Sequence, residues 1–193
     1  MADLVLTMSA ALDRPPDAFE RALEQGERWA VARAFDQHHG VVRALARRLV
    51  ADADAAEDVV QEVFVALPRA MRRYSGKGSL RSFILGITVQ RCKTHRRARA
   101  RRLGAHERFA AHPSSGQVSS EQMAAGRQLA ERLEAALLEL RHGLRAAFVL
   151  VAVEERSAAE AAEILCIPEA TVRTRVFNAR KKLKAAMGKE LER

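Results

Sequence analysis

Apolar side chains recur every three or four residues along most of this chain, over 19–67 and again over 129–183. That spacing matches the 3.6-residue turn of an α-helix and places the apolar side chains on one face. No stretch of useful length alternates apolar and polar residues as a half-buried strand would. Aromatic residues make up only 5% of the 193 residues, which also disfavours an aromatic-rich β-sandwich. The pattern therefore predicts an all-α protein.

Residues 103–120 interrupt this pattern. They contain two glycines, one proline and four serines, with little helical periodicity. Clusters of Gly, Pro and Ser are typical of flexible connections. We therefore predict two small helical domains, at 18–102 and 121–189, joined by a flexible linker at 103–120. Residues 1–17 would precede the first domain as an N-terminal extension.

In the first domain, breaks in the apolar spacing separate four expected helices. The first two lie at 19–23 and 31–49, the third begins near Ala55, and the fourth runs from Leu80 into 91–102. Pro68 should bend or shorten the third helix, because its ring displaces the preceding turn. A loop with two glycines at 74–79 separates the last two helices. Trp29 is expected in the core.

The second domain should contain three or four helices, at about 119–140, 144–154, 157–167 and 168–184. We expect Gly143 to end the first of these. Ser157 and Glu160 have the spacing of a capping box, which marks a helix start. Pro168 should begin the last helix, because proline is well tolerated in a first turn.

Charge is distributed unevenly along the chain. Lys and Arg number 33 against 24 Asp and Glu, a net charge of +9. Five of the acids lie within 52–62, whereas 91–102 and 170–189 contain seven cations each and no acid. Two separate cationic helices indicate two contacts with a phosphate backbone, so nucleic acid is the leading partner.

The segment 157–184 has the form of a helix-turn-helix. Val172 and Val176 should face the first helix of the motif, which leaves a polar and basic face outward. Such a helix offers base-edge donors near its front and phosphate partners towards its end. An ordinary helical hairpin with a solvated basic face is the alternative, but a cationic helix without acids after such a turn favours DNA contact.

Other chemical interpretations of the polar residues are weaker. The 76–79 loop lacks the earlier glycine of a phosphate-binding loop, since Met71 stands there. It is better suited to holding an unstacked base beside Tyr74 and Ser75. The acids at 52–62 lack the central glycine of a calcium loop, and the Cys and His residues lack zinc-finger spacing. We therefore expect no catalytic centre, metal or cofactor.

The cysteines and the apolar runs indicate the cellular compartment of the protein. Cys92 and Cys166 are far apart in sequence, which suggests a reducing cytoplasm rather than a disulfide framework. The N-terminus lacks a signal pattern. The longest apolar run, 146–153, is far shorter than the ~18 residues that span a bilayer. We expect a cytoplasmic protein without membrane insertion.

Two strings in this order resemble the bacterial RNA polymerase sigma factors, specifically the extracytoplasmic-function (ECF) group of the sigma-70 family. Residues 57–64 read EDVVQEVF and residues 171–175 read TVRTR. The resemblance covers about 20–102 and 125–187. It implies a non-catalytic initiation subunit that binds core RNA polymerase and directs it to the −10 and −35 elements of promoter DNA.

The resemblance also implies three sets of functional residues. Those expected to bind core polymerase are Asp58, Gln61 and Glu62. Those expected at the −10 element are Tyr74, Ser75, Lys77, Ser79, Arg91, Lys93, Arg96 and Arg97. Those expected at the −35 element are Thr171, Arg173, Thr174, Arg175, Phe177, Asn178, Arg180 and Lys181.

An anti-sigma factor is a further partner that the resemblance implies. Cys166 stands where the family usually has glycine, and Asn178 where it often has arginine, so the turn geometry and the −35 preference are not carried over. Two rival functions remain: a helix-turn-helix regulator that binds operator DNA as a dimer, and a metal-dependent nucleic-acid enzyme. The second is disfavoured because no carboxylate pair accompanies a basic groove within one motif.

Overall fold

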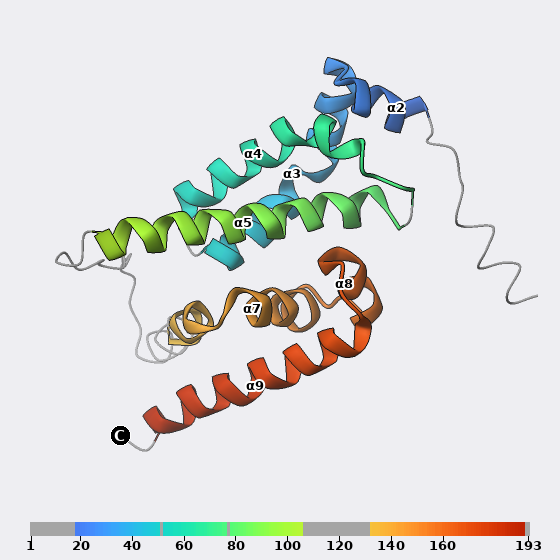
Figure 1. Cartoon of the computed structure of the whole chain (residues 1–193). Coiled ribbons are helices and arrows are strands. Elements are labelled where there is room, and N and C mark those ends of the chain that lie inside the picture. Colours follow the sequence, from blue (N-terminus) through green and yellow to red (C-terminus); the bar gives the residue numbers. More distant parts are fainter. Residues whose placement is uncertain (1–17, 51, 77, 106–131, 192–193) are drawn as a thin grey trace, which may run out of the picture.

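The computed structural model describes residues 18–50, 52–76, 78–105 and 132–191, and all regular structure within them is helical (Figure 1). A helical stretch at 132–139 precedes the elements of the second half. The elements are α2 (Ala18–Gln25), α3 (Arg28–Val50), α4 (Ala53–Met71), α5 (Leu80–Ala105), α7 (His142–Phe148), the π-helical turn η2 (Val149–Val153), α8 (Ala158–Leu165) and α9 (Glu169–Leu191). The prediction of an all-α fold is confirmed.

The first half of the molecule, residues 18–105, is built from α3, α4 and α5, which pack against one another, with α2 against α3 and α4. Leu45 and Leu49 of α3 and Val59 and Val63 of α4 are fully buried, with Ile84 of α5 beside them. These residues follow the helical spacing of the sequence. Their burial leaves the opposite face of α4 exposed, whereas α8 of the second half contacts α5.

Helix α4 begins earlier and ends later than its sequence suggested. The carboxylate of Asp52 accepts a hydrogen bond from the Ala55 backbone N–H at 3.0 Å, so this N-cap starts the helix at Ala53. Pro68 lies inside α4, which continues to Met71. The prediction that Pro68 shortens the helix is therefore wrong. Proline removes the one intrahelical bond that its missing N–H would have donated, and α4 continues for three residues past it.

Trp29 is not a core residue, contrary to expectation, because 52% of it is exposed. Its ring lies against Phe19 with centroids 6.1 Å apart, and its indole N–H donates to the Glu27 carboxylate. The buried face of α3 starts one residue later, with Ala30 and Ala34. A small residue brings α3 closer to its neighbours than tryptophan would allow.

The second half, residues 132–191, contains a break that Gly143 does not cause. The helical stretch at 132–139 ends before Arg141, and Gly143 lies inside α7. A Cβ at Gly143 would lie 3.3 Å from a guanidinium nitrogen of Arg175. The glycine therefore makes room for an arginine of α9 rather than ending a helix.

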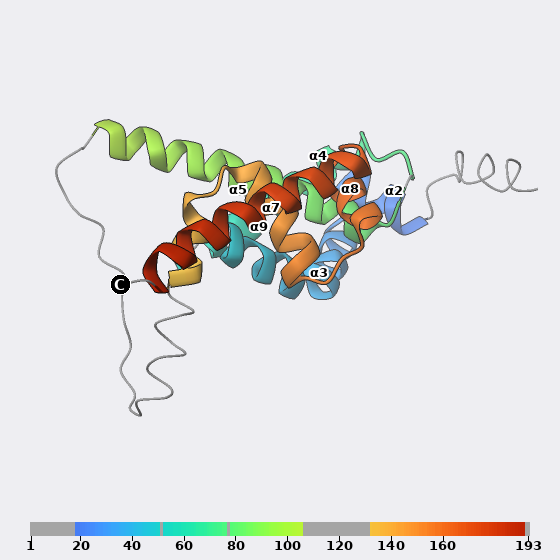
Figure 2. The same cartoon turned by 90° about the horizontal axis from the view of Figure 1, so that it is seen from below.

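The two halves share one hydrophobic core. Ala146, Val149 and Leu150 of the second half are fully buried in the same cluster as the helices of the first half. Helix α8 contacts α5, and α7 and η2 contact α3. Figure 2, which views the molecule from below, shows α7, α8 and α9 in front of the first-half helices. Most of the predicted linker lies outside the described residues, and α5 continues to Ala105.

Candidate nucleic-acid and protein-binding surfaces

The outer face of α4 carries the residues expected to bind a basic partner. Asp58, Gln61 and Glu62 are all exposed and lie one helical turn or less apart. Val65 continues this face and is 82% exposed. Val65 is not among the residues predicted from the sequence, although an apolar residue among polar ones on one helix face can indicate a binding surface.

The neighbouring acids of the same stretch have structural partners. Asp52 caps α4, as described above. The Glu57 carboxylate lies 2.8 Å from Nε of Arg43 and 3.6 Å from Nη2 of Arg47, so it ties α4 to α3. The acidic stretch therefore divides into acids that hold the helix in place and acids that face outward.

One residue of the α4 face is linked to the cationic helix. The Glu62 carboxylate lies 3.7 Å from Nη1 of Arg91 on α5. Arg91 was expected at the −10 element, and Glu62 at core polymerase. The structure thus brings together members of two sets that the sequence could not relate in space.

The loop between α4 and α5 presents a tyrosine and a serine. The Tyr74 hydroxyl donates to the Gly78 carbonyl at 3.0 Å, and its ring lies 5.0 Å from that of Phe83. Gly76 and Gly78 have φ of 69° and 80°, which side chains rarely adopt. Ser75 is exposed, and Lys77 lies outside the described residues. The loop holds Tyr74 beside an aromatic ring at the start of α5.

Ser79 caps the N-terminus of α5. Its Oγ accepts a hydrogen bond from the Ser82 backbone N–H at 3.0 Å, which caps the start of α5. The same hydroxyl donates to Ser82 Oγ at 3.0 Å. Ser79 is exposed, so it can face DNA while it caps the helix.

The four cations of α5 expected at the −10 element do not share one exposed face. Arg91 turns towards Glu62, whereas Arg96 Nη2 donates to the Leu138 carbonyl of the second half at 3.2 Å. Partial burial lowers the pKa of Arg96. Lys93 is half-buried, and Arg97 is exposed. Of the four, only Arg97 is largely exposed, whereas Arg91, Lys93 and Arg96 are half-buried in this arrangement.

The first helix of the helix-turn-helix begins at the predicted capping box. Ser157 Oγ accepts from the Glu160 backbone N–H at 3.1 Å, and the Glu160 carboxylate accepts from the Ser157 N–H at 2.9 Å. These bonds to the charged form lower the pKa of Glu160. The prediction of a helix start here is confirmed.

The turn of the motif contains a strained residue. Cys166 ends α8 with φ 50° and ψ 48°, the left-handed conformation in which glycine is usual. The Ile167 N–H donates to the Ala162 carbonyl at 3.1 Å, which closes the turn. Cysteine therefore adopts a conformation that is usual for glycine, at a conformational cost.

Helix α9 presents the predicted outward face. Val172 and Val176 are buried against the rest of the motif, as expected. Glu169, rather than Pro168, is the first residue of α9, because Pro168 only supplies the carbonyl that Thr171 and Val172 bond. The exposed members of the −35 set are Arg173, Thr174, Phe177, Asn178, Arg180 and Lys181.

Two members of the −35 set lie elsewhere. Thr171 is half-buried, and Arg175 packs over Gly143 of α7. Among the exposed members, the Thr174 hydroxyl donates to the Ala170 carbonyl at 2.9 Å. Arg173 Nη2 donates to Glu169 Oε1 at 2.6 Å.

A fully buried arginine joins the two halves. Nη1 of Arg145 donates to the Leu49 carbonyl at 2.8 Å, and its Nε donates to the Leu137 carbonyl at 2.5 Å. Burial lowers the pKa of Arg145 to about 10. Arg48 and Glu154 form an ion pair across the same boundary. One carbonyl at the end of α3 and one from the 132–139 stretch thus accept hydrogen bonds from a cation of α7.

His142 adds a second polar contact between the halves. Its Nε2 lies 3.1 Å from the Val89 carbonyl of α5 and, as a donor there, leaves Nδ1 unprotonated. Burial, followed by the charge of Arg96, lowers the pKa of His142 to about 4. His142 is therefore neutral in this packing at pH 7.

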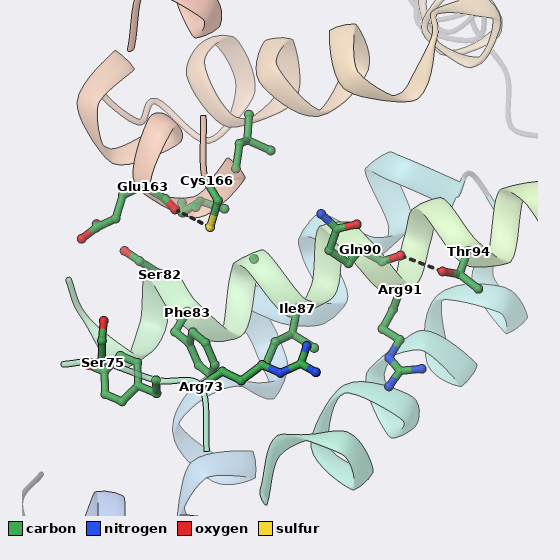
Figure 3. Close-up of a pocket in the computed structure, with 14 residues that line it drawn as sticks. Arg73, Ser75, Ser82, Phe83, Ile87, Gln90, Arg91, Thr94, Glu163 and Cys166 are labelled. Carbon is green, nitrogen blue, oxygen red and sulfur yellow. Dashed lines mark hydrogen bonds between the residues drawn. The ribbon is translucent and has the colours of Figure 1, made fainter. Parts of the chain in front are cut away.

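Helix α8 approaches α5 at a glycine. A Cβ at Gly86 would lie 2.8 Å from the Ile164 carbonyl oxygen, a contact that side chains do not tolerate. Beside it is a cleft of about 680 Å³ lined by residues 73–75, one face of α5, and 163–166. Figure 3 shows Ser82 and Gln90 of α5 pointing from this cleft towards Glu163 and Cys166. The helix-turn-helix therefore lies against the helix expected at the −10 element.

The residues of the boundary between the two halves were not predicted from the sequence. Arg145 and His142 have no motif, because a charged or polar residue on a helix is usually solvated. Gly86, inside a helical pattern, is a weak signal of close backbone approach. In the part of the chain that the structure describes, no helix is long and apolar enough to cross a membrane.

Two family models match the chain. Residues 34–102 match sigma-70 region 2, and residues 130–183 match sigma-70 region 4. The first match contains the α4 face and the α4–α5 loop, and the second contains the helix-turn-helix.

Curated relatives match over most of their length. The RNA polymerase sigma factor CnrH of Cupriavidus metallidurans is 30% identical over 191 residues, covering 92% of this chain and 99% of CnrH. The RNA polymerase sigma-H factor of Pseudomonas aeruginosa is 29% identical, over 80% of this chain and 86% of the relative. The ECF sigma factor SigM of Mycobacterium tuberculosis is 28% identical, over 84% and 80%.

Solved structures share the fold. CnrH in complex with the cytosolic domain of CnrY aligns with a TM-score of 0.60 and 24% identity, over 88% of this chain and 95% of that chain. RpoE in complex with the anti-sigma factor NepR from Bartonella quintana aligns with a TM-score of 0.58 and 22% identity, over 81% and 96%.

Proposed function

The chain belongs to the ECF group of the sigma-70 family of RNA polymerase sigma factors. We propose that separate surfaces of the chain bind core polymerase, the −10 element and the −35 element. A sigma factor binds core RNA polymerase and directs it to promoters. The rival function, a dimeric operator-binding regulator, offers no reason for residues 34–102 to match sigma-70 region 2. The proposal concerns which residues meet which partner.

The α4 face is the core-polymerase docking surface. Asp58, Gln61 and Glu62 project from it into solvent, and two carboxylates there complement a basic surface. Val65 lies on the same face and would add apolar contact at the centre of such an interface. The exposure of this face beside buried core residues on the other side of α4 is the observation that carries the proposal.

The loop and α5 act at the −10 element. Tyr74, Ser75 and Ser79, with Lys77 of the same loop by sequence alone, would hold an unpaired base, and Phe83 supplies a second aromatic ring beside Tyr74. Arg91, Lys93, Arg96 and Arg97 would then meet the backbone of the separated strands. Arg91 and Arg96 must leave Glu62 and Leu138 to do so.

Helix α9 reads the −35 element. Arg173, Thr174, Phe177 and Asn178 lie towards its N-terminal half, where a helix in the major groove meets base edges. Arg180 and Lys181 follow one turn later and suit phosphates. Thr171 and Arg175 would contribute from the flanks of this face.

The partners of the protein are core polymerase, promoter DNA and an anti-sigma factor. The last follows from the two solved relatives, one in complex with CnrY and one with the anti-sigma factor NepR. We infer that the protein is a non-catalytic initiation subunit and that it acts in the cytoplasm. Polymerase supplies the chemistry.

Reversing one charge tests the docking surface. We expect Asp58→Lys to weaken binding of core polymerase about tenfold or more, equivalent to about 1.4 kcal/mol, because it places a cation against a basic partner. Glu24→Lys, an equal reversal at an exposed site on α2, is the matched control and should leave the affinity unchanged. Equal losses in both variants, or none in either, would assign docking to another surface.

A further inference from the structure

Glu169 stands at the front of the exposed face of α9. It is the only acidic residue between 169 and 189, a stretch that carries seven cations. Its carboxylate accepts a hydrogen bond from Nη2 of Arg173 at 2.6 Å, one helical turn later. The Arg173 side chain is 73% exposed and that of Glu169 is 43% exposed, so the pair faces solvent on the surface proposed to meet DNA.

Stability does not account for this pair. An exposed ion pair four residues apart contributes little to folding, because water screens it and two long side chains must be ordered. Its main physical effect is to restrict the rotamers of Arg173. An arginine recognises guanine through two N–H groups aimed at O6 and N7, so its orientation decides whether it reads a base or a phosphate.

The geometry leaves arginine donors free for DNA. A guanidinium has five N–H groups, and Glu169 takes one of those on Nη2. The remaining edge can address a base. When DNA displaces water from the face, the Glu169–Arg173 attraction strengthens and the side chain is already ordered.

We propose that Glu169 is a positioning residue that holds the Arg173 guanidinium in the pose that reads a G·C base pair of the −35 element. The inference rests on the proposed role of α9. Glu169 should also increase sequence selectivity. Because its carboxylate occupies Arg173, it weakens the attraction of that arginine to the phosphates of DNA of unrelated sequence. Asn178 and Thr174 would read neighbouring positions without this support.

Transcription from a promoter library tests the inference. The full chain is combined with core polymerase and a library in which the segment upstream of the −10 element is randomised, and the transcripts are sequenced. Arg173→Ala should remove the preference for one G·C pair. Glu169→Ala should reduce the preference at that same pair by about two- to tenfold, the cost of ordering a free side chain, without weakening total template binding.

Two further variants separate positioning from general effects. Glu169→Gln keeps an oxygen acceptor at the same reach and should restore part of the preference. Glu139→Ala removes an exposed acid from the same half, outside the α9 face, and should leave every preference unchanged. In the Arg173→Ala background, Glu169→Ala should have no further effect on base preference.

The outcomes distinguish the inference from the proposed function. Suppose Arg173→Ala removes a base preference but Glu169→Ala leaves the same preference intact. The positioning role is then wrong, and the −35 role of α9 stands. If the unaltered chain shows no upstream preference at all, the −35 role itself fails.

Discussion

Cys166 occupies a backbone conformation that favours glycine, and this has a measurable cost. A left-handed conformation costs an ordinary residue roughly 1–2 kcal/mol. Glycine avoids this cost because it has no Cβ, but its greater freedom in the unfolded chain offsets part of the gain. We expect Cys166→Gly to raise the free energy of unfolding by about 0.5–1 kcal/mol in urea titration. Cys166→Ala keeps the Cβ and should give no such gain, so a gain in both variants would locate the effect in the thiol.

His142 makes stability depend on pH. Its pKa is about 4 in the fold against 6.5 for a free side chain, so between these values the unfolded chain binds more protons. The free energy of unfolding should therefore fall as pH decreases from 6.5 towards 4, with a contribution of up to about 1.4 kcal/mol per pH unit. The cations Lys93, Arg96 and Arg145 all oppose its protonation.

Replacing the histidine isolates this contribution. His142→Gln can still donate to the Val89 carbonyl but does not titrate. We expect its unfolding free energy to fall less steeply than that of the unaltered chain between pH 7 and pH 5. Parallel slopes for the two proteins would show that His142 is accessible to protons in the fold.

At the level of elements, the start of α8 depends on two reciprocal hydrogen bonds. Ser157→Ala removes the acceptor for the Glu160 N–H and should cost about 1 kcal/mol in thermal or urea unfolding. Glu160→Gln retains an acceptor for the Ser157 N–H and should cost much less. Similar losses in the two variants would mean that the charge of Glu160 stabilises the helix start as much as the Ser157 cap does.

Sequence predicted the elements where local chemistry decides them. The capping box at Ser157, the buried Val172 and Val176, and the outward Arg173 and Phe177 follow from spacing and side-chain type alone. Trp29 and Gly143 were misplaced because their outcome depends on neighbours distant in sequence: the close approach of α3, and the Arg175 side chain over α7. Helix propensity depends on local sequence, so it could not predict either of these contacts.

At the scale of the whole molecule, packing between the halves depends on the absence of a side chain at Gly86. A methyl group there would meet the Ile164 carbonyl at 2.8 Å. We expect Gly86→Ala to separate α8 from α5 and increase the radius of gyration in small-angle X-ray scattering. Gly40→Ala is the control, since nothing lies within 4 Å of its Cβ position. It should leave the scattering unchanged and stabilise α3 by about 0.5–1 kcal/mol.

An unchanged radius of gyration for Gly86→Ala would contradict the prediction that the variant separates α8 from α5. That result would mean that α8 and α5 adjust by a few tenths of an ångström without opening. The sequence could not predict this boundary, because neither the buried Arg145 nor the contact of His142 with Val89 has a local pattern. Both contacts join residues more than 50 positions apart in the chain.

The packing of the two halves against each other limits the distance between the surfaces proposed to bind the −10 and −35 elements. A compact chain of this length has a radius of gyration of about 16 Å. The −10 and −35 elements lie about 25 base pairs apart, which is about 85 Å at roughly 3.4 Å per base pair. In the proposed assignment, the loop at Tyr74 and the face of α9 therefore meet both elements at once only if the two halves separate on polymerase.

Energy transfer between two dyes, one on each half, tests this claim most directly. Cysteines replace the exposed Arg72 and Lys184 in a Cys166→Gly background, while Cys92, buried with its pKa raised to about 12, stays unlabelled. We predict high transfer in the free chain and a large fall when core polymerase and promoter DNA are added. Transfer that stays high while promoter-specific transcripts are made would contradict the account.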